Sequence, residues 1–255
     1  MINICSGVNV DLETNRNSCM ISSIIVSYFL VVPMKNEIKA LIFDFGGVIS
    51  RTLFETHDMS ERQLGLPAGT FSWLGPFDPK GDKLWMKMQF GEITERDYWK
   101  IRTQEVSKLL GKNWREMAQF VKAVRSENPI EVIRPQFLKI FHLANKAKIS
   151  LAILSNELDL FYGADFRSKL PFLKEFKVIH DATYTKVLKP DPKSYIDCID
   201  ALCLAPQDCL FIDDQLRNIK GAEKVGLNTI HFDVTKPDES YNRVAVSVGL
   251  TNGKV

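Results

Sequence analysis

Short apolar runs that stop at polar residues are the feature of this chain that most constrains its fold. Residues 38–43, 149–154, 209–212 and 228–232 are such runs, and residues 177–179 add a fifth. Largely continuous apolar runs, instead of alternating ones, are typical of strands buried on both faces of a parallel sheet. Helical patterns lie between them. The order strand, helix, strand, helix predicts an open α/β sheet.

Helix signals between the runs support this order. Pro135 is a suitable first residue for a helix that reaches residue 146. Asp191 and Pro192 cap and start a helix that runs to residue 201. Residues 215–225 follow the third long run with apolar residues at helical spacing, and a glycine stops them. Each helix is therefore long enough to connect two parallel strands.

The segment between the first run and Pro135 has a different character, because it shows helical patterns and no strand pattern. Thr94 and Asp97 form a capping box that predicts a helix to Leu110, and Asn113 with Glu116 predicts the start of the next helix. An insertion of this length predicts an all-helical cap over the open end of the sheet. Four tryptophans are expected in the core of this cap, namely Trp73, Trp85, Trp99 and Trp114.

These patterns divide the chain into three parts. We predict a sheet core made of residues 37–50 and 130–255, with the helical cap made of residues 51–129. Residues 1–36 are predicted to be an N-terminal extension outside the fold. Its apolar stretch, residues 20–32, is too short to cross a membrane, which needs about 20 helical residues.

Charge and cysteine content exclude several classes of protein. The 33 basic residues nearly balance the 31 acidic ones and leave a net charge of +2, so no excess of positive charge indicates a nucleic-acid or anionic-membrane partner. The five cysteines contain no CxxC pair, which argues against a disulfide framework and a structural zinc site. We therefore expect a cytoplasmic protein without nucleic-acid or membrane partners, and the sequence does not predict its oligomeric state.

Polar side chains follow three of the apolar runs, at the sheet edge where open α/β proteins bind ligands. These residues are Asp44, Ser155, Asn156, Asp213 and Asp214, and Lys189 lies in a loop expected at the same edge. Neighbouring carboxylates raise each other's pKa unless a cation neutralises them. Mg²⁺ prefers such oxygen ligands and completes its shell with phosphate. Lysine and serine would hold the phosphate, and Asp44 could attack it to form an aspartyl-phosphate.

Four motifs in this order resemble the haloacid-dehalogenase-like (HAD) hydrolases. They are LIFDFGGVIS, LAILSNE, KPDPKSY and LFIDDQLRNIKGAEKVGLNTIHF, and the resemblance covers residues 37–232. The position of the helical insertion is similar to that in the subfamily with a C1 cap. FDFGGVIS and FGEITERDYW are similar to the branch of sugar-phosphate phosphatases and the phosphatase half of soluble epoxide hydrolase. The family implies a Rossmann-like core and Mg²⁺-dependent hydrolysis of phosphoesters.

The resemblance also implies roles around a metal ion. Asp44 matches the nucleophile, and Gly46 matches the residue whose backbone carbonyl ligates the metal. Asp214 matches the main metal-binding carboxylate. Asp213 is a second candidate ligand with an alternative structural role, and Asn218, one helical turn further on, is expected behind the ligands.

Three further residues match the groups that hold phosphate in the family. Ser155 matches the hydroxyl, the backbone of Asn156 lies beside it, and Lys189 matches the lysine that neutralises nucleophile and phosphate. The resulting prediction is a Mg²⁺-dependent phosphatase that hydrolyses a small phosphomonoester. The leading substrates are a sugar phosphate and a nucleotide monophosphate.

Gly46 departs from the family pattern, because most family phosphatases carry aspartate there as general acid and base. Such a group typically contributes about 10²–10⁴-fold to the rate. A good leaving group or a residue near the first motif could compensate, and Glu55, His57 and Asp58 are candidates.

Two rival functions stay open at this point. The first is metal-independent carbon–halogen hydrolysis by the same nucleophile, which the Asp213–Asp214 pair disfavours because the dehalogenases of the superfamily need no metal. The second is a non-catalytic protein that still binds phosphate, and its support is Gly46.

Overall fold

The structure is a computed structural model that describes residues 37–125 and 128–250. The predicted N-terminal extension, residues 1–36, lies outside the described residues. In the described part of the chain, no helix is both long and apolar enough to cross a membrane.

Five parallel strands form the sheet in the order β3-β2-β1-β4-β5. They are β1 (Ala40–Phe43), β2 (Ser150–Ser155), β3 (Val178–Asp181), β4 (Cys209–Asp213) and β5 (Asn228–His231). All five predicted strands are confirmed, including the short third one, and their ends differ from the prediction by at most two residues. The α/β fold with its parallel core is therefore the one expected from the apolar runs.

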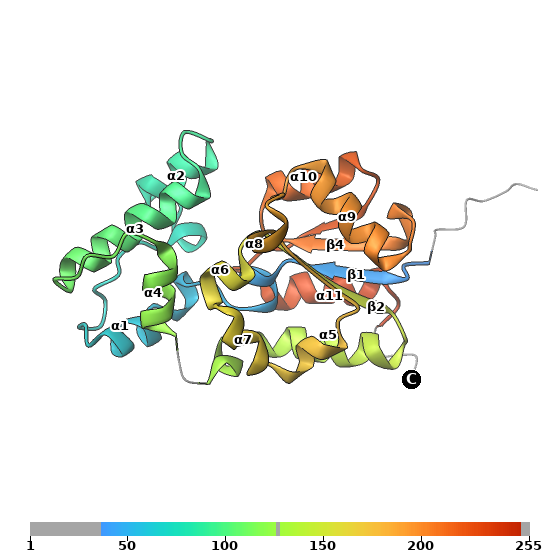
Figure 1. The fold of residues 1–255 in the computed structure, drawn as a ribbon, viewed down its shortest axis with the longest axis horizontal. Helices are drawn as coiled ribbons and strands as arrows, with labels where there is room; N and C mark the ends of the chain where they lie inside the picture. The colour runs from blue at the N-terminus through green and yellow to red at the C-terminus, as the bar shows by residue number, and fades with distance from the viewer. Residues whose placement is uncertain (1–36, 126–127, 251–255) are drawn as a thin grey trace, which may run out of the picture. The chain divides into compact units, whose positions relative to one another are not determined.

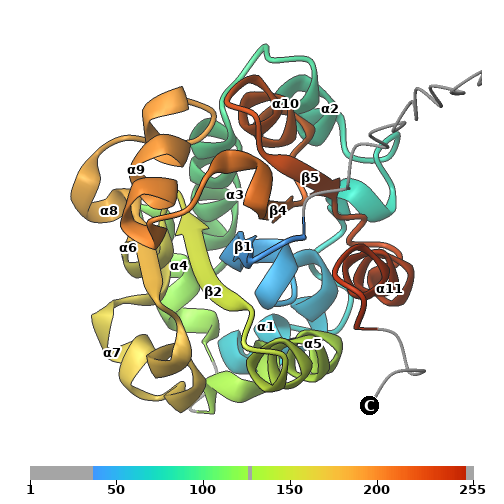
Figure 2. The same cartoon turned by 90° about the vertical axis from the view of Figure 1, so that its right-hand side faces the viewer.

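Helices cover both faces of the sheet (Figures 1 and 2). One face carries α9 (Pro192–Leu202) and α10 (Leu216–Lys224). The other carries α5 (Pro135–Lys146) and α11 (Pro237–Ser247), the latter not predicted from the sequence. Coverage on both faces explains why the strand runs are continuously apolar, since neither face meets water.

The central strand β1 shows how this burial is divided. Ala40 and Ile42 point into the cluster beneath α9 and α10, while Leu41 and Phe43 point into the cluster beneath α5 and α11. All four are fully buried. The alternation follows from the pleat, which sends successive side chains to opposite faces.

The cap is built from helices alone in its described residues. They are α1 (His57–Leu64), α2 (Lys83–Gln89), α3 (Glu95–Leu109) and α4 (Met117–Val124). The Phe54 ring lies within 5.7 Å of the rings of Trp73, Trp85 and Trp99, measured between centroids. The cap thus has an aromatic core of its own, and Figure 1 shows its helices beside the sheet, not stacked on its faces.

The ends of the cap helices test the predicted caps. The Thr94 capping box is present, with its side chain accepting from the Asp97 N–H, and α3 ends at Leu109. The prediction that Asn113 starts the next helix is wrong. Glu116 is the N-cap of α4, because the Gln119 side chain accepts the Glu116 N–H and completes the box there.

The remaining helical elements are short. In the core they are α6 (Leu158–Tyr162), α7 (Ala164–Ser168) and α8 (Ala182–Thr185), which follow β2 and β3. Short 3₁₀ turns are Phe54–Thr56, Gly75–Phe77, Pro129–Val132, Pro171–Glu175 and Pro206–Asp208. A tight turn, Phe45–Ile49, follows β1 and is closed by the Ser50 N–H donating to the Phe45 carbonyl.

Replacement of Phe137 by alanine tests the packing beneath the sheet. Its ring is fully buried and meets the Phe43 ring edge-on at 5.6 Å between centroids. We expect Phe137→Ala to lower the free energy of unfolding by about 3–5 kcal/mol, measured by urea denaturation. Phe90→Ala is the matched control, because Phe90 is 72% exposed and should change stability by about 0.5 kcal/mol or less. Equal effects of the two variants would contradict the assignment of this core.

Candidate functional site

The strand register brings the predicted site residues to one edge of the sheet. Phe43, the last residue of β1, lies opposite Ile153 on β2 and Ile212 on β4. Asp44 therefore follows β1 at the level where Ser155 ends β2 and Asp213 ends β4. The Asp44 N–H donates to the Ile212 carbonyl at 2.9 Å, which extends the pairing by one step and fixes the start of the turn.

A buried lysine joins two of the aspartates. Lys189 is 4% exposed, and its Nζ lies 2.8 Å from Asp44 Oδ1 and 2.7 Å from Asp213 Oδ2. Burial on its own would lower the pKa of Lys189, but the Asp213 and Asp44 carboxylates outweigh this effect and hold it above its ordinary value. Lys189 is thus a permanent cation beneath the nucleophile position.

The side chain of Asn156 holds the backbone of this lysine, a role that the sequence analysis missed. The Lys189 N–H donates to Asn156 Oδ1 at 2.7 Å, and Asn156 Nδ2 donates to the Lys189 carbonyl at 3.2 Å. This reciprocal pair ties the end of β2 to the loop before α9. The spacing of 33 residues between the partners gave no local signal for it.

Asp213 is fully buried, and protein groups use its oxygens. Besides Lys189, its carboxylate accepts the Gln215 N–H at 2.7 Å and both of its oxygens accept Asn218 Nδ2 at 3.1 Å. Asn218 therefore contacts Asp213 from α10, as its i+5 position allows. Three hydrogen bonds and the ion pair with Lys189 favour a supporting place for Asp213 over direct contact with a ligand.

Asp44, Asp213 and Asp214 form a cluster in which one oxygen of each lies within 4.8 Å of the others. Burial raises the pKa of Asp44 to about 7, with Lys189 opposing and Asp213 adding to the shift. Burial and the two neighbouring carboxylates also raise the pKa of Asp214 well above its usual range. Such shifts report carboxylates crowded together with too little positive charge.

The charge and donor set of this cluster fit a divalent cation. When all three carboxylates are ionised, the one ammonium leaves two negative charges uncompensated, which a divalent cation would offset. Every donor is a hard oxygen, the ligand type that Mg²⁺ prefers. Asn218 adds a buried Oδ1 without a hydrogen-bond partner, which a water of a hydrated ion would satisfy.

Two adjacent glycines in the turn after β1 have different reasons to be glycine. Gly47 has φ +79°, and a Cβ there would lie 2.7 Å from Oδ2 of Asp214. Its lack of a side chain is thus what lets the turn approach Asp214 closely. Gly46 has φ −70° and ψ 129°, an ordinary conformation, and a Cβ there would meet nothing within 4 Å.

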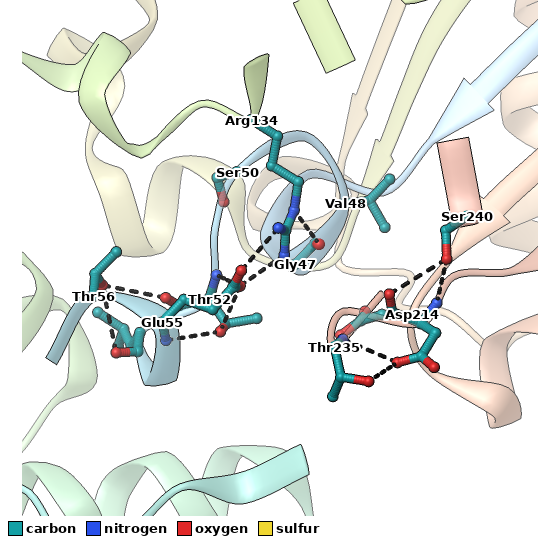
Figure 3. Close-up of polar contacts among 12 residues, drawn as sticks. Gly47, Val48, Ser50, Thr52, Glu55, Thr56, Arg134, Asp214, Thr235 and Ser240 are labelled. Carbon is teal, nitrogen blue, oxygen red and sulfur yellow. Dashed lines mark hydrogen bonds and ion pairs between the residues drawn. The ribbon is translucent and has the colours of Figure 1, made fainter. Parts of the chain in front are cut away.

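An arginine from the start of α5 supports this turn. Arg134 is buried, and its Nε donates to the Gly47 carbonyl at 3.0 Å while its two terminal nitrogens donate to the Glu55 carboxylate at 2.8 and 2.7 Å. Figure 3 shows the guanidinium between these two partners. Arg134 thereby joins the turn, the start of the cap and α5.

Glu55, His57 and Asp58, the candidates to replace the acid that is missing at position 46, lie outside the site. Glu55 is held by Arg134, and Asp58 is exposed and pairs with Arg62. His57 packs against the Trp73 ring, and burial lowers its pKa to about 4. None of these three candidates lines the cavity described next.

A cavity of about 400 Å³ lies between the sheet edge and the cap. From the core, it is lined by Asp44, Gly46, Ser155, Asn156, Lys189, Asp214 and Asn218. From the cap, it is lined by Leu53, Phe54, Trp85, Trp99 and Met117, among others. The structure thus brings all the predicted site residues together, and all of them line the cavity except Asp213, which contacts Lys189 from the protein interior. Trp85 and Trp99 belong both to the core of the cap, as predicted, and to the cavity wall.

Two ion pairs cross from the cap to the core beside this cavity. Arg96 of α3 pairs with Glu157, and Glu95 pairs with Arg217 of α10. Burial raises the pKa of the Glu157 carboxyl, with Arg96 opposing the shift. The sequence analysis missed both pairs, because their partners are 61 and 122 residues apart.

Comparison with known proteins shows the family. The family model of the haloacid dehalogenase-like hydrolases matches residues 38–226, and the chain therefore belongs to this family. The predicted family and the assignment as a hydrolase are confirmed. The C1-cap subfamily and the sugar-phosphatase branch stay predictions.

Individual relatives are distant. The chain is 27% identical over 217 residues to acyl-CoA dehydrogenase family member 10 of Mus musculus, covering 83% of this chain but only 19% of that protein. It is 25% identical to the plasmid protein CbbY of Cupriavidus necator, with 75% and 77% of the two chains covered. It is 23% identical to YhcW of Bacillus subtilis, which its name describes as a candidate phosphatase, with 76% and 82% covered.

Solved structures that resemble this chain also have low sequence identity to it. A HAD family enzyme of Bacteroides thetaiotaomicron, described in complex with magnesium and inorganic phosphate, has 21% identity and a TM-score of 0.47, with 77% of this chain and 95% of that chain covered. A HAD phosphatase from Thermococcus onnurineus has 17% identity and a TM-score of 0.48, with 77% and 86% covered.

The two glycines give a matched test of the turn. Gly47→Ala should lower the free energy of unfolding by about 1–2 kcal/mol, because alanine is strained at φ +79° and its Cβ displaces Asp214. Gly46→Ala should change it by about 0.5 kcal/mol or less, since neither strain nor contact arises there. Thermal or urea denaturation measures both. Similar losses in the two variants would show that the turn differs from the one described.

Proposed function

We propose that this protein is a Mg²⁺-dependent phosphatase that hydrolyses a small phosphomonoester through an aspartyl-phosphate at Asp44. One observation carries the proposal. Asp44 lines the cavity, contacts the buried cation Lys189 at 2.8 Å and belongs to a cluster of three carboxylates. Membership of a hydrolase family and the resemblance of all four motifs support the same reaction.

The residues of the core divide the work of binding and attack. Ser155 and Lys189 line the cavity beside Asp44 and supply a hydroxyl and a positive charge for the phosphate oxygens. Asn156 holds the Lys189 backbone in place. The Asp44 carboxylate attacks phosphorus, and water then hydrolyses the resulting acyl phosphate and regenerates the carboxylate.

The metal would be held by Asp44, Asp214 and the backbone carbonyl of Gly46. When bound, Mg²⁺ offsets the negative charge of carboxylates and phosphate. Asp213 is assigned a supporting part, because it orients Lys189 and its oxygens are already engaged by Asn218 and Gln215.

The cavity limits the substrate to a small molecule. A volume of about 400 Å³ lies at the low end of the range for small-molecule sites. A sugar phosphate and a nucleotide monophosphate are the substrates suggested by the resemblance of the motifs.

A phosphate-release screen across small phosphomonoesters with Mg²⁺ tests this function. We expect turnover that EDTA abolishes and added Mg²⁺ restores, because the carboxylate cluster otherwise repels the phosphate. Asp44→Asn should lower kcat/KM by at least about 10³-fold, since it removes the nucleophile and keeps the shape of the side chain. Asp58→Asn is the matched control and should leave kcat/KM unchanged, because Asp58 is exposed and pairs with Arg62 outside the cavity.

Two outcomes would contradict the proposal. Dehalogenation of a 2-haloacid that depends on Asp44 and survives EDTA would favour the metal-independent rival. Absence of Asp44-dependent turnover on every phosphomonoester, together with binding of inorganic phosphate, would favour a protein that binds phosphate without catalysis.

A further inference from the structure

The fold does not require glycine at position 46, where most phosphatases of the family carry an aspartate. Gly46 has backbone angles that any residue adopts, and a Cβ would meet nothing within 4 Å. An aspartate would therefore fit, in contrast to position 47, where a side chain is excluded. Gly46 itself lines the cavity together with Asp44.

Other acidic groups around the cavity are already engaged. Among the described lining residues outside the aspartate cluster, the carboxyl groups are Glu95 and Glu157, which pair with Arg217 and Arg96. The lining contains no histidine or cysteine in these residues. The Tyr162 hydroxyl lies 3.2 Å from Ser50 Oγ, and burial raises its pKa. No lining group stands out as a proton donor for a departing oxygen.

Without a donor, the leaving oxygen departs with its negative charge. The transition state of phosphoryl transfer is loose, so much of this charge has developed on the oxygen when the bond breaks. A phenol, with a pKa of about 10 as in tyrosine, carries the charge far better than an aliphatic alcohol, whose pKa is close to the value of about 15.7 for water. The site as built therefore favours esters of acidic hydroxyl groups.

Part of the cavity wall is apolar and aromatic. The cap contributes Leu53, Phe54, Trp85, Trp99 and Met117, and the core adds Leu158, Phe161 and Leu188. Such a wall excludes water from a flat ring and packs against its faces and edges. Polar side chains also line the cavity, among them Arg51, Thr52 and Thr94, so the apolar part of the wall favours a ring without excluding hydroxyl groups.

We infer that the substrate class is an aryl phosphate, the phosphomonoester of a phenol or of a hydroxylated heteroaromatic ring. This inference rests on the proposed phosphatase function. Asp44 forms a bond to phosphorus while the bond from phosphorus to the aryl oxygen breaks, and the electron pair leaves with the aryloxide, which takes a proton from water. A water molecule then attacks phosphorus, and inorganic phosphate leaves as the Asp44 carboxylate re-forms.

Phenyl phosphate and benzyl phosphate form the decisive pair, because both carry one ring and differ mainly in the acidity of the leaving group. We expect kcat/KM with Mg²⁺ to be at least about 10²-fold higher for phenyl phosphate, the lower range of a general acid's contribution. The ratio kcat/KM is the right measure because it reports bond cleavage even if release of phosphate from Asp44 is slow. A ratio near one would overturn the inference.

Variants at position 46 test the cause. Gly46→Asp should raise kcat/KM for benzyl phosphate, because it supplies the missing proton. The ratio of kcat/KM for phenyl phosphate to that for benzyl phosphate should then fall at least about tenfold. Gly46→Asn is matched in size but cannot donate an acidic proton, so it should leave this ratio unchanged. An equal fall of the ratio in both variants would overturn the inference. So would a selective loss of benzyl phosphate turnover in Glu157→Gln, since it would identify Glu157 as a donor.

Phosphonates, which contain no ester bond to cleave, test whether the apolar wall binds a ring. Benzylphosphonate should inhibit at least about tenfold more strongly than methylphosphonate, because only the former buries a ring. Equal inhibition would contradict the assigned wall. The substrate class and the proposed function fail in different ways. Asp44-dependent hydrolysis of alkyl and aryl phosphates at similar rates would contradict only the substrate class. Absence of Asp44-dependent hydrolysis of any ester would contradict the proposed function itself.

Discussion

The buried ion pairs of Lys189 are the interaction on which the site depends. An ammonium removed from water is tolerated only where carboxylates surround it, and Asp44 and Asp213 do so at 2.8 and 2.7 Å. The same cation lets three carboxylates crowd at one sheet edge. Asn156 fixes the backbone of Lys189, and Asn218 fixes Asp213, so a neutral side chain holds each of these two charged residues in place.

The elements and site residues that could be predicted are those set by local patterns. Strands buried on both faces are recognisable in the sequence as apolar runs. The residue after each run lies at the edge of the parallel sheet where ligands bind. Asp44, Ser155 and the pair Asp213 and Asp214 follow from this rule, while the resemblance to the family singled out Asp214. The structure places Asp44, Ser155 and Asp214 around one cavity. The Thr94 box was also visible, because both its partners lie within one helical turn.

What could not be predicted depends on partners that are distant in sequence. Arg134 reaches Gly47 and Glu55 across about 80 residues, and nothing beside it in the chain indicates a role. The start of α4 at Glu116 could not be predicted, because it depends on the Gln119 side chain, whereas Asn113 is the residue type preferred as a cap. Trp85 and Trp99 line the cavity because of how the cap helices pack, which the sequence does not reveal.

The first turn of α3 contains two neighbouring residues of opposite charge that both reach the core. Glu95 finds an arginine on α10 and Arg96 finds a glutamate after β2, so the cap supplies the anion to one pair and the cation to the other. A shift of this helix by one position would bring Arg96 toward Arg217 in one direction or Glu95 toward Glu157 in the other. The two pairs of opposite polarity consequently favour one orientation of the cap against the core, and that orientation determines which aromatic side chains line the cavity.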